Sequence, residues 1–273
     1  MLLVSGCSFT ESNYWSGKVG SHFNQPVYNL GFSMNGNSYI AKTIINEISN
    51  HFLYNERLVV GIMWSMVSRK EILINRKETI DWEFLTQEKF PKKFPENQYW
   101  YHMNINDSLF TKGHNSIEKI PTKSSDIDNI WIKSGGGVHF NSYSENGRAS
   151  DRDFWRIWYS NYYTYEGAMW ETLENILRVQ WFLDKYKIPY FMTSVEDIFT
   201  EGISKYKNLN HLYKLIDFNK FCLYKETKGI TEHNIENGYL LDEGHHPTKE
   251  GNVAFCNDII IPHIEKNNLF GDN

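Results

Sequence analysis

Short apolar runs alternate with amphipathic segments along the first third of the chain. Leu2–Val4 and Pro26–Leu30 predict two short strands. Arg57–Met63 is a continuous apolar run, which is typical of a strand buried on both faces of a parallel sheet. Between them, Asn37–Phe52 carries isoleucines at the spacing of a helix. This order predicts a parallel sheet with right-handed crossovers and helices on both faces.

The same alternation resumes in the last third of the chain. Glu166–Tyr186 predicts a long amphipathic helix, Tyr190–Ser194 a strand, and Leu212–Tyr224 a further helix. Thr248 is placed to cap a last helix that runs through Ile264. We therefore expect an α/β protein with a three-layer α/β/α, flavodoxin-like arrangement around a central parallel sheet.

The pattern is interrupted between about residues 70 and 160, where the sequence is irregular and rich in Asn, Lys, Gly and aromatic residues. A structureless loop of this length is uncommon in a compact domain, so residues 70–160 are expected to form a large inserted cap after the third strand, within a single domain of residues 1–273. A small independent domain is the alternative. Flat aromatic side chains in this region suit sugar rings, although they can equally pack the core of the insertion. They are Trp131, Trp155, Trp158, Tyr159, Tyr162, Tyr163 and Tyr165.

Composition narrows the classes of partner. Hydrophobic residues make up 41% of the 273 residues, which excludes a disordered chain. The net charge of −5 argues against a nucleic-acid binder, whose affinity comes mainly from clustered Lys and Arg. No apolar run approaches the ~20 residues of a membrane span, and the apolar start is too short for a secretory leader. The expected location is therefore cytoplasmic, and no membrane partner is expected.

Polar segments follow the predicted strands at their carboxyl ends, where ligands bind in open α/β sheets. They are Gly6-Cys7-Ser8, Asn35-Gly36-Asn37 and Trp64-Ser65, and a fourth segment, DEGHHP at 242–247, lies near the other end of the chain. A serine is a weak nucleophile that needs a histidine to take its proton, and the histidine needs a carboxylate to fix its tautomer. These segments can therefore assemble a Ser–His–acid triad.

Four segments in this order resemble the sequence blocks of the SGNH (GDSL-like) hydrolases. GCSFT at 6–10 is similar to the first block, Gly-Asp-Ser, with Cys7 in the Asp position. NLGFSMNGNS at 29–38 is similar to the second block, and VVGIMWS at 59–65 occupies the third, where the Asn of the family is missing. DEGHHP is similar to the last block, Asp-x-x-His followed by Pro. The resemblance covers most of the chain outside the insertion.

The resemblance implies a role for one residue of each block. Ser8 would be the nucleophile and His246, which precedes Pro247, the catalytic base. Gly36 would donate an oxyanion N–H, with Gly31 as the alternative, and Ser65 is the nearest polar replacement for the missing Asn. The family mechanism uses neither a metal ion nor an organic cofactor.

Two assignments at the site stay open. Glu243 lies three residues before His246, whereas Asp242 lies three before His245 and has the residue type of the family. Either carboxylate can orient the base. Arg69 follows the third block closely and could bind an anion or a carbonyl, or be a solvated surface charge.

The leading hypothesis is a serine ester hydrolase that removes acyl groups, such as acetyl, from a carbohydrate or other small ester. The second hypothesis is an O-acyltransferase that uses the same site. The two reactions share their chemistry and differ in whether water or a sugar hydroxyl accepts the acyl group. A non-catalytic glycan-binding protein that keeps the fold is the third. A zinc site at the His-His pair is disfavoured, because no third ligand follows at short spacing.

Overall fold

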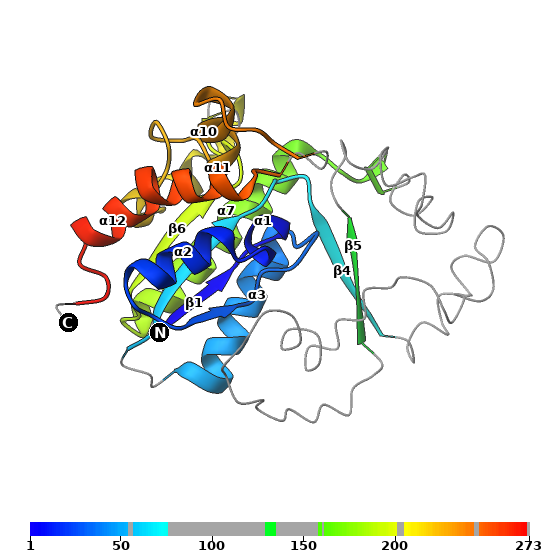
Figure 1. The fold of residues 1–273 in the computed structure, drawn as a ribbon. Coiled ribbons are helices and arrows are strands. Elements are labelled where there is room, and N and C mark those ends of the chain that lie inside the picture. The colour runs from blue at the N-terminus through cyan, green and yellow to red at the C-terminus, as the bar shows by residue number, and fades with distance from the viewer. Residues whose placement is uncertain are drawn as a thin grey trace, which may run out of the picture. The chain divides into compact units, whose positions relative to one another are not determined.

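A four-stranded parallel sheet forms the centre of the fold in the computed structural model (Figure 1). The strands are β1 (Leu2–Ser5), β2 (Val27–Asn29), β3 (Val59–Trp64) and β6 (Tyr190–Ser194), in the order β2-β1-β3-β6. All neighbouring pairs are parallel, and β1, β3 and β6 are completely buried. The predicted α/β class with a parallel sheet is confirmed, and each predicted strand lies within two residues of its expected bounds.

The structure describes residues 1–53, 57–75, 129–134, 158–159, 161–200, 205–242 and 246–271. The chain divides into two compact units. The first joins Met1–Arg69 to Thr164–Asn273 and contains the parallel sheet, and the second is Lys70–Tyr163. The expected role of residues 70–160 as a cap over the site stays a prediction.

One face of the sheet is covered by α2 (Tyr14–His22), α11 (Lys249–Phe255) and α12 (Ile261–Lys266). Leu2 and Val4 of β1 share a buried apolar cluster with side chains of these three helices. The side chains alternate along β1, so that Ser5 faces the other side, where its Oγ lies 3.1 Å from Thr43 Oγ1.

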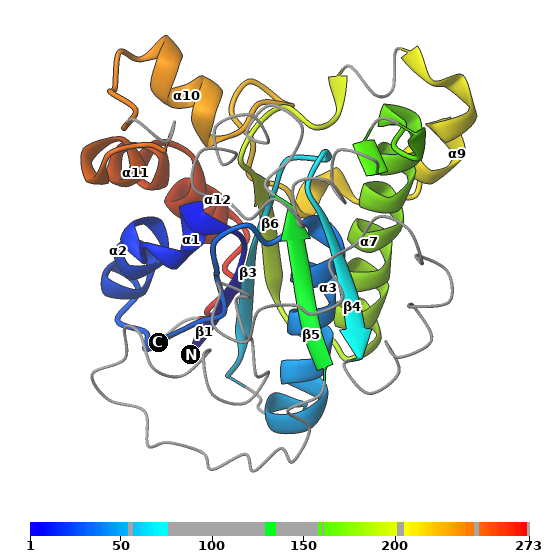
Figure 2. The same cartoon turned by 90° about the vertical axis from the view of Figure 1, so that its right-hand side faces the viewer.

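Thr43 belongs to α3 (Asn37–Glu47), which packs beside α7 (Tyr165–Lys185) on the second face. Figure 2 shows α2, α11 and α12 on one side of the strands and α3 and α7 on the other. The carboxyl ends of the strands therefore lie between two layers of helices, as expected for an open α/β sheet.

Two helices follow the sequence prediction with one local change each. α3 continues as a π-helical turn over Ile48–Phe52, which together cover the predicted segment. Thr248 caps α11 as predicted, with its Oγ1 accepting a hydrogen bond from Gly251 N at 3.4 Å. A π-helical segment, Cys256–Ile260, then separates α11 from α12.

The predicted helix over Leu212–Tyr224 is wrong. The chain instead forms 3-10 turns at Lys207–Leu209 and Phe218–Lys220 around the short α9 (Asn210–Tyr213). Phe221 then makes a parallel bridge with Met192 of β6, and Cys222 N donates to Met192 O at 2.8 Å. The backbone N–H and C=O groups of this segment therefore bond to the edge strand of the sheet instead of to one another within a helix.

Within the described part of the chain, the sequence pattern did not predict α1 (Ser8–Glu11), α2 or α10 (Ile230–Glu236). The first has a single turn, too short for a periodic signal. In α10, Glu232 caps the helix by accepting a hydrogen bond from Gly229 N at 2.9 Å. A prediction based on hydrophobic spacing does not detect a capping residue, so it missed this helix.

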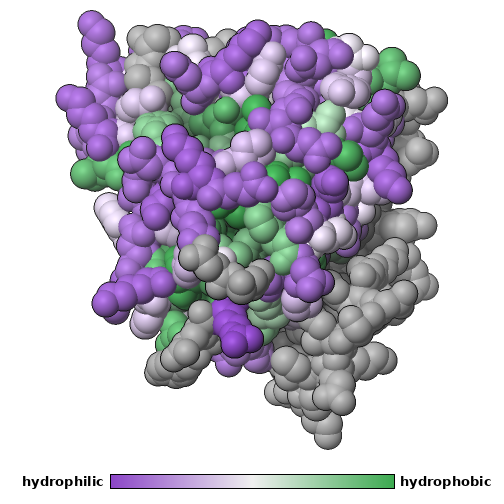
Figure 3. Space-filling view, turned by 60° about the vertical axis from the view of Figure 1, so that its left-hand side comes forward, coloured by the Kyte–Doolittle hydropathy of each residue, from purple (hydrophilic) through white to green (hydrophobic). Residues whose placement is uncertain are grey.

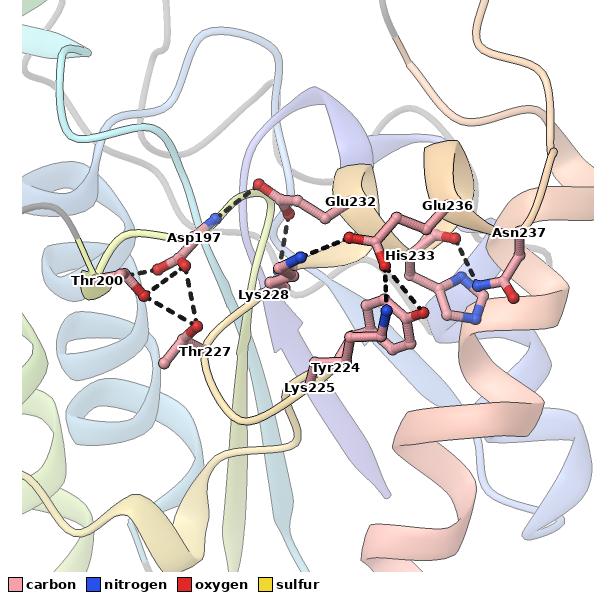
Figure 4. Close-up of polar contacts among 11 residues, drawn as sticks. Asp197, Thr200, Tyr224, Lys225, Thr227, Lys228, Glu232, His233, Glu236 and Asn237 are labelled. Atoms are coloured by element: carbon pink, nitrogen blue, oxygen red, sulfur yellow. Dashed lines mark hydrogen bonds and ion pairs between the residues drawn. The ribbon is translucent and has the colours of Figure 1, made fainter.

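A polar network holds the segment after β6 against α10 (Figure 4). The Asp197 carboxylate accepts hydrogen bonds from the backbone of Phe199 and Thr200 at 3.0 and 2.9 Å, and from the hydroxyls of Thr200 and Thr227 at 2.6 and 2.9 Å. Burial raises the pKa of Asp197, but these hydrogen bonds outweigh it and leave the pKa below its ordinary value. Glu232 closes the network by accepting from Asp197 N at 3.0 Å.

Two lysines flank an exposed carboxylate in the same region. Lys225 and Lys228 each place their Nζ 2.5 Å from Glu236, on its two carboxylate oxygens. These contacts lower the pKa of Glu236 to about 2. The Glu236 carboxylate is exposed and its ion pairs are screened by salt, so these pairs contribute little to the stability of the fold.

In the second unit, β4 (Lys70–Asn75) pairs antiparallel with β5 (Asn129–Ser134). Trp158 and Tyr162 pack with their ring centroids 5.9 Å apart, and Tyr159 and Tyr163 at 5.1 Å. These contacts favour packing for part of the aromatic group, whereas Tyr162 is still 69% exposed. Trp155 and the side chain of Trp131 lie outside the described part of the structure.

Figure 3 shows a face of the molecule on which hydrophilic residues predominate, with hydrophobic residues visible in smaller areas between them. Exposed large hydrophobic side chains include Trp181 at 55% and Leu240 at 76%. Among the described residues, no helix is long and apolar enough to cross a membrane.

Candidate active site

Ser8 is placed by the sharp turn that leaves β1. The strand ends at Ser5, and Ser8 begins α1, in which Thr10 N and Glu11 N both donate to Cys7 O. Gly6 is required at the turn, because an added Cβ would lie 2.1 Å from Thr10 Oγ1. The turn therefore sets the nucleophile candidate at the carboxyl end of the first strand.

Asn35 ties the turn after β1 to the loop after β2. Its amide Nδ2 donates to Gly6 O at 3.0 Å, and Phe32 N donates to the same carbonyl at 3.2 Å. The Asn35 side chain is completely buried, so its amide is committed to this structural bond. The sequence placed Asn35 in a polar segment but gave no indication of this contact.

His246 is presented by a loop whose ends pair with each other. Asp242 N donates to His246 O at 2.8 Å, and Leu241 bridges Pro247 in an antiparallel sense. Asn252 of α11 fixes the far side, because its Nδ2 donates to Pro247 O at 2.9 Å. This buried residue also escaped the sequence analysis, since an Asn inside a helix carries no distinctive pattern.

The structure brings Ser8, His246 and Asp242 together. Ser8 Oγ lies 2.7 Å from His246 Nε2, which is the length of a good hydrogen bond. His246 Nδ1 lies 3.5 Å from Asp242 Oδ1, and the same oxygen accepts a hydrogen bond from His246 N at 2.8 Å. The side chains of His246 and Asp242 are 33% and 57% exposed. Residues 238 positions apart thus meet in a serine–histidine–carboxylate arrangement.

The ring of Phe9 packs against the ring of His246. Its ring centroid lies 4.7 Å from that of His246 at an angle of 43°, and Phe9 is buried in the apolar core. An imidazole that rests on a fixed aromatic side chain has fewer rotamers available, so Phe9 helps to hold Nε2 toward Ser8. Phe9 was not among the residues singled out from the sequence.

Gly36 and Ser65 lie at the same edge of the sheet and are linked through Asn37. Gly36 precedes α3 in an extended conformation, and Ser65 directly follows β3. Asn37 Oδ1 accepts from Ser65 N at 2.7 Å, and Asn37 Nδ2 donates to Ser65 O at 3.1 Å. Ser65 N–H is therefore already used, and among the described residues the buried Ser65 Oγ has no hydrogen-bond partner.

Arg69 and Gly31 are described only by their local surroundings, so their predicted roles stay predictions. Arg69 closes a turn through its backbone N, which donates to Met66 O at 3.2 Å, and its Nε and Nη1 are buried without a partner among the described residues. Gly31, the alternative oxyanion residue, is packed against Thr10 and leaves no room for a side chain. Glu243, the rival carboxylate, lies outside the described residues, as do Gly244 and His245.

No group of three or more His, Cys, Asp or Glu side chains that could hold a metal ion occurs within the described ranges. The cysteines Cys7, Cys222 and Cys256 are free and buried. Burial raises the pKa of Cys222 to about 12 and that of Cys256 further, so these two thiols are poor nucleophiles at neutral pH.

Comparisons with family models, with curated proteins and with solved structures each found no match to this chain. The chemistry of the site therefore rests on its own geometry. A hydroxyl within hydrogen-bond distance of an imidazole, with a carboxylate behind the second ring nitrogen, is an arrangement in which the hydroxyl can be deprotonated as it attacks.

Proposed function

We propose that this protein is a serine ester hydrolase of the SGNH type that works through an acyl-enzyme. The observation that carries the proposal is the 2.7 Å contact between Ser8 Oγ and His246 Nε2, made by residues from opposite ends of the chain. The strand order β2-β1-β3-β6 supports it, because the first four strands of flavodoxin-like sheets follow the same order once the β4-β5 pair is set aside.

Each residue of the triad has a defined step. Ser8 Oγ attacks the acyl carbonyl while His246 Nε2 takes its proton, and the protonated ring then gives that proton to the departing alkoxide. Asp242 holds Nδ1–H and stabilises the imidazolium. A water molecule, deprotonated by His246, attacks the acyl-enzyme and releases the acid and free Ser8.

The negative oxygen of the tetrahedral intermediates needs hydrogen-bond donors. The donors that we assign to it are Gly36 N–H, Ser8 N–H and the Ser65 hydroxyl. Each such donor typically contributes about 3–4 kcal/mol to the transition state. We propose an acylated carbohydrate as the substrate class, on the basis of the aromatic side chains in Lys70–Tyr163, and no cofactor is needed for the reaction.

The test is Ser8→Ala, with Ser12→Ala as the matched control because Ser12 is an exposed serine at the end of the same helix, α1. Wild type and Ser12→Ala should release a burst of p-nitrophenol from p-nitrophenyl acetate, and Ser8→Ala should lose at least about 1,000-fold in kcat. Mass spectrometry after a fluorophosphonate should find the adduct on Ser8. Retention of more than about a tenth of the wild-type turnover by Ser8→Ala would refute the proposal.

A further inference from the structure

One side chain, Asn37, joins three elements at the carboxyl edge of the sheet. It is the first residue of α3, it binds both backbone groups of Ser65 at the end of β3, and its Nδ2 also donates to Thr172 Oγ1 of α7 at 3.1 Å. Asn37 is 4% exposed and Thr172 is 2% exposed. All the hydrogen bonds of this side chain are therefore shielded from water.

We propose that Asn37 is the positioning residue of the oxyanion pocket, because it fixes Ser65 relative to the neighbouring Gly36 N–H. This inference rests on the proposed function. The hydrogen bonds of Asn37 take up Ser65 N–H and Ser65 O and leave its hydroxyl as the remaining donor of that residue. Ser65 stands where the resemblance implies an Asn, and the Asn that binds its backbone is the first residue of α3.

The geometry explains why a backbone clamp is needed. A serine hydroxyl reaches less far than the amide of an asparagine, so its backbone must be set more accurately for the donor to meet the oxyanion. A misplacement of about 1 Å in a catalytic group can cost about 100-fold in rate. Asn37, bonded to both the N–H and the C=O of Ser65, restrains the two peptide groups on either side of the Ser65 Cα.

The principal variant is Asn37→Ala, compared with Thr172→Val and with Asn175→Ala as the matched control. Asn175 is a buried Asn on α7 whose Nδ2 donates to Glu171 O at 2.7 Å, so it reports the cost of losing a buried side-chain bond away from Ser65. Asn37→Ala should lower kcat by about 10- to 100-fold with KM changed less than about threefold. Thr172→Val, which keeps both bonds to Ser65, should lose only a few-fold, and Asn175→Ala should keep its kcat.

A comparison of an ester with its thionoester separates positioning from simple loss of structure. Sulfur accepts hydrogen bonds weakly, so oxyanion donors accelerate the ester more than the thionoester. Asn37→Ala should therefore lower the ester-to-thionoester ratio of kcat/KM about tenfold, as expected for weakened oxyanion donors. A smaller folded fraction would lower both rates equally and leave the ratio unchanged.

The outcomes are distinct from those for the nucleophile. If Ser8→Ala is inactive but Asn37→Ala keeps the wild-type ratio, the positioning role is wrong and the proposed function stands. If Asn37→Ala does not fold, Asn37→Asp provides the test, because it keeps the acceptor for Ser65 N–H and loses the Nδ2 donor. Circular dichroism identifies the folded variants, and an unchanged ratio in Asn37→Asp would overturn the inference.

Discussion

Asp242→Asn is the sharpest test of how the histidine is oriented. Asp242 Oδ1 accepts a hydrogen bond from His246 N at 2.8 Å and lies 3.5 Å from Nδ1 of the same residue. An asparagine keeps an oxygen for the backbone bond, so the loop can keep its shape. The substitution removes the negative charge that faces the imidazolium and leaves the rest of the contact in place.

The separation of 3.5 Å sets the size of the effect. Two unit charges at this distance attract by about 4.7 kcal/mol at an effective dielectric constant of about 20, and by about 1.2 kcal/mol in bulk water. Because the Asp242 side chain is 57% exposed, solvent screening moves the value toward the lower limit. A loss of about 2.7 kcal/mol corresponds to about 100-fold in kcat, and this is the expected result for Asp242→Asn.

The assay is the steady-state hydrolysis of p-nitrophenyl acetate, with the burst amplitude used to count active sites. Glu243→Gln is the matched control, because the adjacent carboxylate is the rival orienting group; we expect it to lose less than about tenfold. A larger loss in Glu243→Gln than in Asp242→Asn would show that Glu243 orients the base. Equal and mild losses in both would assign the task to a water molecule or a backbone carbonyl.

Two further substitutions test the packing that supports the site. Burial raises the pKa of Glu47 above its ordinary 4.5, although a hydrogen bond from Tyr28 and the nearby His51 act in the opposite direction. The folded state therefore loses stability as the pH rises above the pKa of the unfolded chain, so Glu47→Gln should raise the urea midpoint at pH 8 and leave it nearly unchanged at pH 4. An equal shift of the midpoint at both pH values would refute burial as the cause. Gly61→Ala would place a Cβ 2.6 Å from Phe191 Cζ in the core of the sheet. Such overpacking should reduce the free energy of unfolding by about 1–3 kcal/mol. A urea midpoint equal to that of the wild type would contradict the predicted clash.

The buried elements were the predictable part of this fold. A strand covered on both faces, such as Val59–Trp64, must be apolar throughout, and a long helix such as α7 must carry an apolar stripe, so both leave a periodic signal. The segment at Leu212–Tyr224 has helical spacing as well, but Phe221 and Cys222 pair with β6 instead. Pairing of this kind depends on residues distant in sequence, so local periodicity does not reveal it.

The same distinction between local and long-range signals applies to the residues of the site. The proximity of Ser8 and His246 could be predicted, because the proposed nucleophile and base are residue types that stand at the ends of particular elements in the sequence. The contacts of Asn37 were not predictable, because they join it to a backbone 28 residues away that only the folded sheet brings within reach. The choice between Asp242 and Glu243 depends on loop conformation. The hairpin-like pairing of Asp242 with His246 places the carboxylate four residues before the histidine beside its ring. A spacing rule taken from sequence assumes a loop geometry, whereas the backbone pairing between Asp242 and His246 is set by the folded loop and is not visible in the spacing.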